Sequence, residues 1–121
     1  MENYITELKF QEACWRWYHN SYGRFDHYGR LFRVKNELDA HANAQSRQRQ
    51  LAENRGTGIV PGVADFGFII DVNMVWIELK LPNGVQSQEQ KVWQQLVLRS
   101  GMLYFVVRTM DEFQQIIKTY I

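Results

Sequence analysis

Apolar and polar residues alternate most clearly between Gly58 and Lys80, where two alternating runs are separated by a turn. The first run opens on Asp65, and the second closes on Glu78, Leu79 and Lys80. Because successive strand side chains point to opposite faces, Glu78 and Lys80 share one face and Leu79 points to the other. The pattern predicts a β-hairpin that carries charged groups at its open end.

The register of this hairpin decides which side chains face one another. A two-residue turn at residues 71–72 places Asp65 opposite Glu78, and one at residues 72–73 places Asp65 opposite Lys80. In either register these charged residues lie on one face, whereas a three-residue turn without a bulge would separate them. The apolar residues expected to meet on the other face are Phe66, Phe68, Ile70, Val75, Ile77 and Leu79.

The chain before the hairpin predicts a helix, a strand and a second helix. Residues 6–20 have helical apolar spacing, residues 30–35 alternate loosely as a strand with a basic face, and residues 38–54 form a polar helix on the surface or against a partner. Residues 55–58 are expected to be a flexible link because they contain two glycines. The first helix is expected to bury Phe10, Cys14, Trp17 and Tyr18.

The chain after the hairpin predicts a helix, a strand and a closing helix. Ser87 and Gln90 have the spacing of a capping box, and the helix that they open ends near Gly101. Residues 103–107 predict a buried strand and residues 111–120 a short helix. The order indicates a right-handed crossover and a mixed α/β sheet of about four strands flanked by helices. The side chains expected to point inward are Val92, Trp93, Leu96, Val97, Phe113, Ile116 and Ile117.

An aromatic cluster, Trp-Arg-Trp-Tyr, occupies residues 15–18. Such a cluster can stack on nucleic-acid bases, but core packing with one exposed aromatic is the preferred interpretation. Cys14 lies in the same run and, as the only cysteine, is expected to be a buried thiol. His19 and His27 lack a third ligand at metal spacing, which argues against a zinc site.

Size and composition are those of one folded domain spanning residues 1–121. The chain is 45% hydrophobic and 14% aromatic, which suffices for a packed core and argues against disorder. No apolar run reaches membrane-spanning length, and the first residues lack the features of a signal peptide. The expected location is therefore cytoplasmic, with no membrane partner.

Positive charge is unevenly spread, although the net charge of +1 does not itself indicate a partner. A basic segment beside an acidic metal site suits a polyanionic substrate, and a solvated helix face accounts for it about equally well. The basic residues between the first predicted helix and the hairpin include Arg24, Arg30, Arg33, Lys35, Arg47, Arg49 and Arg55.

The charged residues of the hairpin indicate chemistry, because charge on an otherwise apolar element is costly unless it is paired or binds a cation. Asp65 and Glu78 would form a hard-oxygen site of the kind that holds Mg²⁺. Lys80 can orient or deprotonate a water and stabilise charge on a phosphate. Taken alone, the Glu-Leu-Lys string also fits a solvated strand end.

Several motifs occur in a characteristic order along almost the whole chain. They are Glu7-x-x-Phe10-Gln11, Lys35-Asn36-Glu37, Gly62-Val63-Ala64-Asp65, Ile77-Glu78-Leu79-Lys80, Ser87-x-x-Gln90-x-x-Trp93, Leu96, Gly101 and Val106-Val107-Arg108. In this order they resemble the VRR-NUC domain, a branch of the PD-(D/E)xK nuclease superfamily. The resemblance implies a restriction-endonuclease-like core and metal-dependent hydrolysis of DNA phosphodiester bonds. Stand-alone members of this size resemble Holliday-junction resolvases and tend to be homodimers.

The resemblance also assigns roles to individual residues. Asp65 and Glu78 match the family's metal ligands, which with the Leu79 backbone carbonyl would hold one or two Mg²⁺ or Mn²⁺ ions. Glu7 matches the helix acid and is expected to be an outer, weaker ligand through water, although the helix dipole alone explains an acid in a first turn. Lys80 matches the catalytic lysine.

The glutamine that follows the family's core falls on Gln90, whose amide is expected to reach the nucleophilic water or a phosphate. Two positions depart from the family pattern: Ala64 and Lys35 stand where proline is common. Neither supplies a metal ligand, so both are interpreted as changes in backbone restraint. DNA contacts are expected at Arg33, Lys35, Asn36 and Arg55.

The expected substrate is branched or duplex DNA, read by shape, because 121 residues leave little room for a domain that reads sequence. One alternative is a catalytically silent nucleic-acid-binding module of the same fold, against which the presence of all four catalytic candidates argues. The other is a nuclease of the same fold acting on flaps, linear DNA or RNA, or in the manner of a restriction enzyme.

Overall fold

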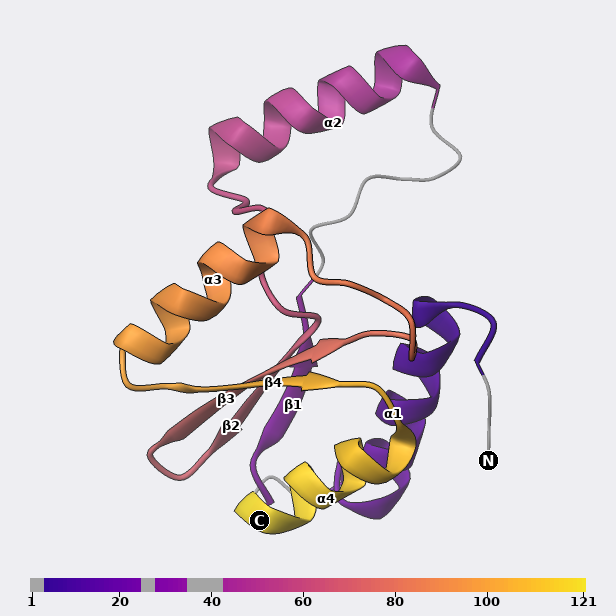
Figure 1. Cartoon of the computed structure of the whole chain (residues 1–121), viewed down its shortest axis with the longest axis vertical. Coiled ribbons are helices and arrows are strands. Elements are labelled where there is room, and N and C mark those ends of the chain that lie inside the picture. The colour runs from indigo at the N-terminus through magenta and orange to yellow at the C-terminus, as the bar shows by residue number, and fades with distance from the viewer. Residues whose placement is uncertain (1–3, 25–27, 35–42) are drawn as a thin grey trace.

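The computed structural model describes residues 4–24, 28–34 and 43–121, and Figure 1 shows their arrangement. The elements in chain order are α1 (Glu7–Ser21), β1 (Arg30–Arg33), α2 (Ala44–Thr57), β2 (Phe66–Ile70), β3 (Asn73–Leu79), α3 (Gln88–Arg99), β4 (Leu103–Val107) and α4 (Met110–Tyr120). Within these described ranges, no helix combines the length and the apolar character that crossing a membrane requires.

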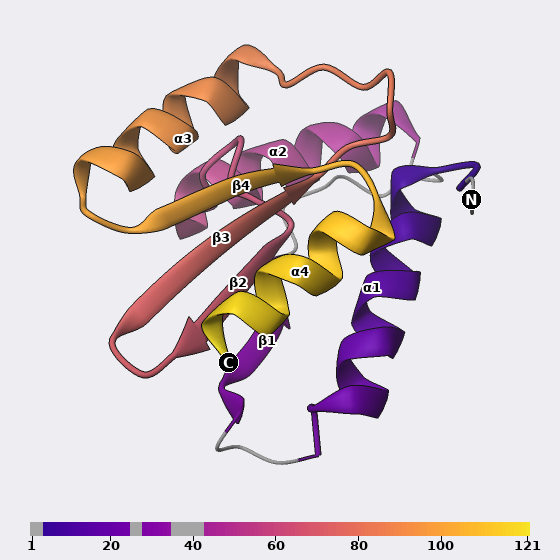
Figure 2. The same ribbon diagram turned by 60° about the horizontal axis from the view of Figure 1, so that its bottom comes forward.

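The strands form one mixed sheet in the order β1-β2-β3-β4. The first three strands pair antiparallel, whereas β3 and β4 are parallel. The crossover helix α3 covers one face of the sheet, and α1 and α4 cover the other (Figures 1 and 2). The predicted mixed α/β sheet of four strands flanked by helices is therefore confirmed, with the hairpin strands β2 and β3 at its centre.

The β2–β3 hairpin adopts one of its two predicted registers. Phe66 pairs with Ile77, and the connection is the two-residue turn at residues 71–72. Asp71 in this turn has a φ of 51°, the left-handed backbone that tight hairpin turns require. The predicted apolar face is confirmed, because all of its members are buried: Phe66, Phe68, Ile70, Val75, Ile77 and Leu79.

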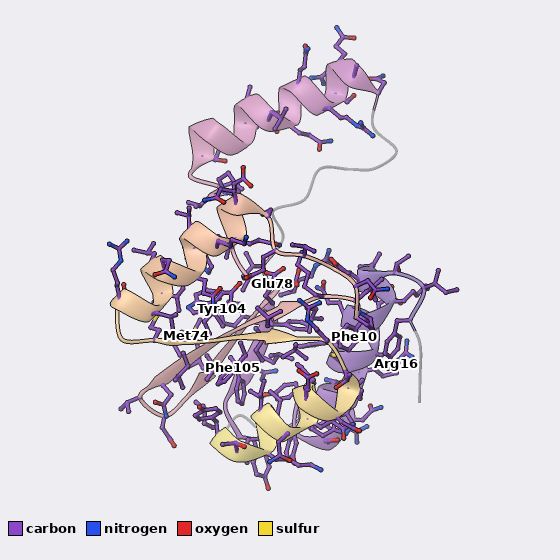
Figure 3. The ribbon with its side chains drawn as sticks, viewed as in Figure 1. Phe10, Arg16, Met74, Glu78, Tyr104 and Phe105 are labelled. Carbon is purple, nitrogen blue, oxygen red and sulfur yellow. The ribbon has the colours of Figure 1, made fainter. Side chains whose placement is uncertain are left out.

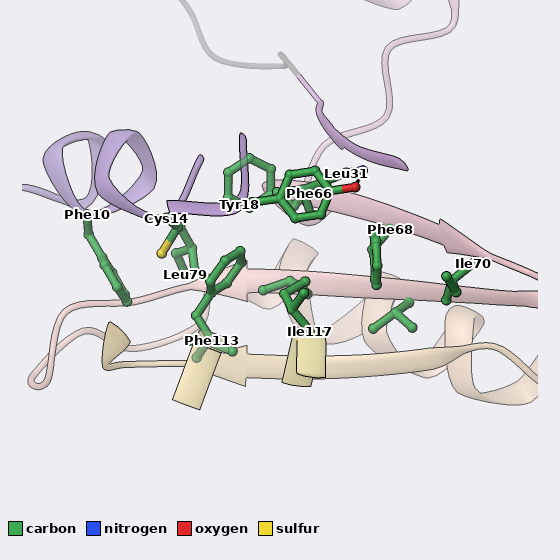
Figure 4. Close-up of a cluster of buried hydrophobic side chains, with 13 residues drawn as sticks. Phe10, Cys14, Tyr18, Leu31, Phe66, Phe68, Ile70, Leu79, Phe113 and Ile117 are labelled. Carbon is green, nitrogen blue, oxygen red and sulfur yellow. Dashed lines mark hydrogen bonds between the residues drawn. The ribbon is translucent and has the colours of Figure 1, made fainter. Parts of the chain in front are cut away.

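The larger core lies between the sheet and helices α1 and α4 (Figure 4). Its buried members outside the hairpin are Phe10, Cys14 and Tyr18 of α1, Leu31 of β1, Val107 of β4, and Phe113 and Ile117 of α4. Trp17 packs against this core while Trp15 stays 39% exposed, so the aromatic cluster divides as predicted. Cys14 is buried as predicted, and its burial, followed by the charge of Asp65, raises the pKa of its thiol.

A smaller cluster lies between α3 and the sheet. Its members are Ala64, Val97 and Tyr104, with Trp76, Trp93, Met102 and Val106 partly buried against them. The rings of Trp76 and Trp93 meet edge to face with centroids 5.4 Å apart. Val92 and Leu96 were predicted to point inward but are 60% and 47% exposed. That prediction was wrong because α3 lies mainly over the edge strand β4, so only part of its apolar stripe faces the sheet.

Helix α2 differs from its prediction at both ends. It begins at Ala44 and continues to Thr57, so most of the predicted link at residues 55–58 is helical instead. Gly58, with a φ of 89°, follows the last helical residue and supplies the left-handed backbone that commonly ends a helix. The described side chains of α2 are mostly exposed, as expected for a polar surface helix, and residues 38–42 of the prediction lie outside the described part.

Strand β1 forms an edge of the sheet and covers residues 30–33 of the predicted strand. Its two arginines, Arg30 and Arg33, are both exposed. Because they are three positions apart, they point to opposite faces of the sheet. Lys35, which would share a face with Arg33, lies outside the described residues, so the predicted basic face of residues 30–35 stays a prediction.

Candidate active site

Asp65 lies at the open end of the central hairpin, where the register puts it opposite Glu78. Its carboxylate Oδ2 accepts a hydrogen bond from the Leu79 N–H at 2.8 Å. Its backbone carbonyl accepts another from the Val34 N–H at 2.9 Å. Backbone groups on both sides of Asp65 therefore fix the position of its carboxylate.

Glu78 is a buried acid, only 2% exposed, between the sheet and α3 (Figure 3). Its Oε1 accepts a hydrogen bond from Gln90 Nε2 at 2.7 Å, and its Oε2 is buried with no hydrogen-bond partner among the described residues. Burial, and then the charge of Asp65, raise the pKa of Glu78 to about 9, while the charge of Lys80 acts in the opposite direction. The chain alone thus supplies too little positive charge to keep this acid ionised, a condition that a bound cation relieves.

Lys80 directly follows β3 and is 7% exposed. Its backbone N–H donates to the Val107 carbonyl at 2.9 Å, which fixes it against the end of β4. Its Nζ lies 3.9 Å from Oε1 of Glu7 in the first turn of α1. The structure thus brings Glu7 to the same place as the hairpin residues.

Gln90 uses both ends of its side-chain amide. Its Oε1 accepts a hydrogen bond from the Ser87 N–H at 2.8 Å, which completes the predicted capping box of α3. Its Nε2 donates to Glu78, so one side chain both caps the helix and holds the buried acid.

An open cavity of about 240 Å³ lies in front of Asp65, Glu78 and Gln90, and Lys80 is not among the residues that line it. Its lining comprises Glu7, Pro61, Gly62, Val63, Asp65, Glu78, Ser87, Glu89 and Gln90. Gly62 has a φ of 86°, and a Cβ there would collide with the backbone of Glu89, so only glycine lets this loop lie against α3. Glu89 was not predicted to belong to the site, and its position beside Gln90 was the available signal.

Arg108, the last residue of the motif Val106-Val107-Arg108, contacts the turn that follows Lys80. Its Nη1 donates to the carbonyls of Leu81 at 2.9 Å and Gly84 at 2.7 Å, with Pro82 farther away at 3.4 Å. These carbonyls form the turn that follows Lys80. One guanidinium therefore holds the connection between the lysine and α3.

No protein-family model and no curated protein matches the chain. A solved structure described as a VRR_NUC domain protein is similar, with a TM-score of 0.72 at 18% sequence identity, and the match covers 99% of this chain and 91% of that chain. The chain has the fold of a VRR_NUC domain. This likeness concerns the fold, and the residue roles below rest on the geometry of the site.

Within the VRR_NUC fold, the residues of the site fit a divalent cation. Two facing carboxylates are hard ligands of the kind that Mg²⁺ and Mn²⁺ accept alongside waters and phosphate oxygens, and one of them has a buried oxygen with no hydrogen-bond partner in the described part of the chain. The part of the chain that the structure describes contains no group of three or more acids, histidines or cysteines placed to hold a metal. Oε1 of Glu7 lies 3.9 Å from Nζ of Lys80, and its role as an outer ligand stays a prediction.

The predicted DNA contacts are only partly described. Arg33 is exposed at the end of β1. Lys35 and Asn36 lie outside the described residues, and so does the side chain of Arg55.

Proposed function

We propose that this chain is a metal-dependent DNA endonuclease that hydrolyses phosphodiester bonds and selects branched DNA, in the manner of a Holliday-junction resolvase. The observation that carries the proposal is the pair Asp65 and Glu78 facing each other across the hairpin, with Glu78 Oε2 buried and without a hydrogen-bond partner among the residues that the structure describes. Such an oxygen is costly unless a cation neutralises it. The fold shared with a VRR_NUC domain protein supports a nuclease-type domain.

Asp65 and Glu78 would hold Mg²⁺ or Mn²⁺ together with the Leu79 carbonyl, and Glu7 would contribute through water. A bound divalent ion supplies Lewis acidity and lowers the pKa of water. Gln90 keeps one oxygen of Glu78 oriented through its 2.7 Å hydrogen bond and leaves the other oxygen for the cation.

Lys80 is the buried cation of the site, and its ammonium would orient the attacking water or stabilise charge on the scissile phosphate. Its Nζ lies 3.9 Å from Oε1 of Glu7, which itself lines the cavity. Electrostatic stabilisation of this type matters most where water is excluded, as it is around a side chain only 7% exposed.

Two copies of the chain are proposed to associate, since paired cuts across a four-way junction require two active sites. The exposed Val92 and Leu96 on α3 are the features that support an interface. Light scattering of the purified protein should give a dimer mass, and Val92→Glu together with Leu96→Glu should give a monomer. A monomeric wild type at micromolar concentration would remove this part of the proposal.

The proposal is tested by cleavage of labelled four-way junction, flap, single-stranded and duplex DNA with Mg²⁺, Mn²⁺, Ca²⁺ or EDTA. Lys80→Ala should lower the cleavage rate by about a hundredfold or more, the usual contribution of a positioned catalytic group. Lys91→Ala, which removes an exposed lysine of α3, is the matched control and should cleave normally. Binding of DNA without cleavage under every metal condition would instead indicate a silent binding module, and cleavage of RNA alone would overturn the assignment to DNA.

A further inference from the structure

A second cavity, of about 310 Å³, lies on the face of the sheet that α1 covers. It is lined by Leu8, Gln11, Glu12 and Trp15 of α1, Arg33 of β1 and Phe66 of β2. Its volume lies at the lower end of the roughly 300–1,000 Å³ of sites that take small molecules. We call it the α1 groove.

The α1 groove adjoins the candidate active site along two chain segments. Gln11 is four residues, about 6 Å of axial rise, beyond Glu7, which lines the active-site cavity. Phe66 directly follows Asp65, and Arg33 pairs with Phe66 across β1 and β2. Asp65 and Phe66 point to opposite faces of the sheet, so the groove and the acids lie on the two sides of the same end of β2, joined along α1 by Glu7 and Gln11. A strand that passes around this end of the sheet can reach both.

The walls of the α1 groove offer an aromatic face and apolar contacts. Trp15 is 39% exposed, and its ring stacks on His19 with centroids 6.1 Å apart and an interplanar angle of 23°. Leu8 is 48% exposed, and Phe66 is buried. An indole held by a second ring is a rigid surface on which a planar base can stack.

The polar groups of the α1 groove suit a nucleotide. Gln11 is only 8% exposed, and its amide forms no hydrogen bond with any residue in the described ranges. An amide carries both donors and an acceptor, which suits the edge of a base. Arg33 supplies a positive charge at the groove for a phosphate. The negative charge of Glu12 is offset by Lys9, whose Nζ lies 3.4 Å from its carboxylate.

We propose that the α1 groove binds one unpaired base of the DNA strand beside the scissile phosphate, with the base stacked on Trp15, its edge at Gln11 and its phosphate at Arg33. The placement of this base beside the scissile phosphate rests on the proposed function. The groove then favours DNA in which the nucleotide next to the cut is unpaired, as at a flap or an opened junction.

Binding without cleavage tests the groove separately from catalysis. A fluorescein-labelled single-stranded DNA oligonucleotide is titrated by anisotropy in Ca²⁺ with wild type, Trp15→Ala, Trp15→Phe and the control Leu98→Ala, which shortens a half-exposed apolar residue of α3. Trp15→Ala should weaken binding about tenfold, within the range for loss of one stacked base. Trp15→Phe keeps an aromatic face and should stay within about threefold of wild type, as should Leu98→Ala.

Abasic oligonucleotides locate the base. A series carrying one abasic site at successive positions should show one position that weakens wild-type binding about tenfold and leaves Trp15→Ala unchanged, because the same contact cannot be lost twice. Equal losses in both proteins at every position would overturn the inference, and so would tighter, Trp15-dependent binding of the matching RNA. DNA cleavage by a Trp15→Ala protein with unaltered binding would overturn the groove while leaving the nuclease intact. DNA binding that depends on Trp15, without cleavage under any metal condition, would support the groove and overturn the proposed nuclease activity.

Discussion

Gln90 and Glu78 are joined by a 2.7 Å hydrogen bond between the first turn of α3 and the end of β3. The same amide closes the capping box with Ser87. Helix capping and orientation of the buried acid are therefore two tasks of one side chain, and mutation can separate them.

Ser87→Ala should remove the cap and leave the contact with Glu78. We expect a loss of about 1 kcal/mol in the free energy of unfolding, the usual cost of losing an N-cap, with cleavage nearly unchanged. Gln90→Ala should cost at least as much stability and also lower cleavage, because Glu78 then loses its hydrogen-bond donor. Urea denaturation and cleavage rates of both variants provide the comparison, and equal loss of activity in the two would contradict it.

Glu78→Gln should change how stability depends on pH in metal-free buffer. The pKa of Glu78 is raised from 4.5 to about 9, so between these values the folded state holds a proton that the unfolded state releases. The stability contributed by this proton is full below about pH 4.5 and is lost as the pH rises toward 9. Glutamine mimics the neutral acid, so the melting temperature of Glu78→Gln should increasingly exceed that of wild type from pH 5 to pH 9. A constant difference would show that Glu78 titrates normally.

Mg²⁺ or Mn²⁺ should raise the free energy of unfolding of the wild-type protein, by an amount set by the ratio of the free ion concentration to the Kd. At a free concentration one hundred times the Kd, the expected gain is about 2.7 kcal/mol. Asp65→Asn and Glu78→Gln should show little or none of this gain, and calorimetry with EDTA as reference measures it. An equal shift in all three proteins would place the ion elsewhere.

Gly62→Ala should damage the site through its backbone. Its φ of 86° and the collision with Glu89 predict a destabilisation of more than about 1 kcal/mol together with reduced cleavage. Gly56→Ala is the matched control, because a Cβ there meets nothing and the residue lies within α2. It should stabilise the protein by roughly 0.5–1 kcal/mol, and similar urea midpoints for the two variants would refute the role of Gly62.

Arg108→Gln should loosen the turn after Lys80. Loss of hydrogen bonds from a charged donor to the Leu81 and Gly84 carbonyls should cost about 1.5–3 kcal/mol. Hydrogen exchange at Gly84, whose N–H donates to the Leu81 carbonyl, should become faster. Arg99→Gln, at the exposed end of α3, is the control and should stay within about 0.5 kcal/mol of the wild-type free energy of unfolding. Unaltered hydrogen exchange at Gly84 in Arg108→Gln would contradict the role of Arg108 in holding this turn.

The sequence was most informative where structure follows from neighbouring residues. Alternation along the hairpin, together with its turn, predicted that Asp65 and Glu78 share a face, and the capping-box spacing predicted the start of α3. These features depend on contacts within a few residues or on a strict period of two.

The predictions failed, or were silent, where distant segments meet. Nothing local in the sequence shows that Gly62 must lie against Glu89 or that Arg108 reaches back to the turn at residues 81–84. The exposure of Val92 depends on which strand α3 covers, which is a property of the assembled sheet. Gly56 was part of a predicted flexible link, but helix α2 continues through it to Thr57. The low helix propensity of one glycine is a weak signal that the surrounding helical residues can override.

The parallel pairing of β3 with β4 has a consequence for how the chain would acquire the proposed activity. The hairpin can form early because its strands are adjacent in the chain, but β4 must close across the whole crossover, a slower event that incurs more loop entropy. Until then Lys80 lacks the Val107 carbonyl that anchors it, and α3 has no packed sheet to hold Gln90 over Glu78. The proposed activity should therefore depend on closure of the crossover, and a chain in which β4 has not yet paired would carry the acids without an ordered site.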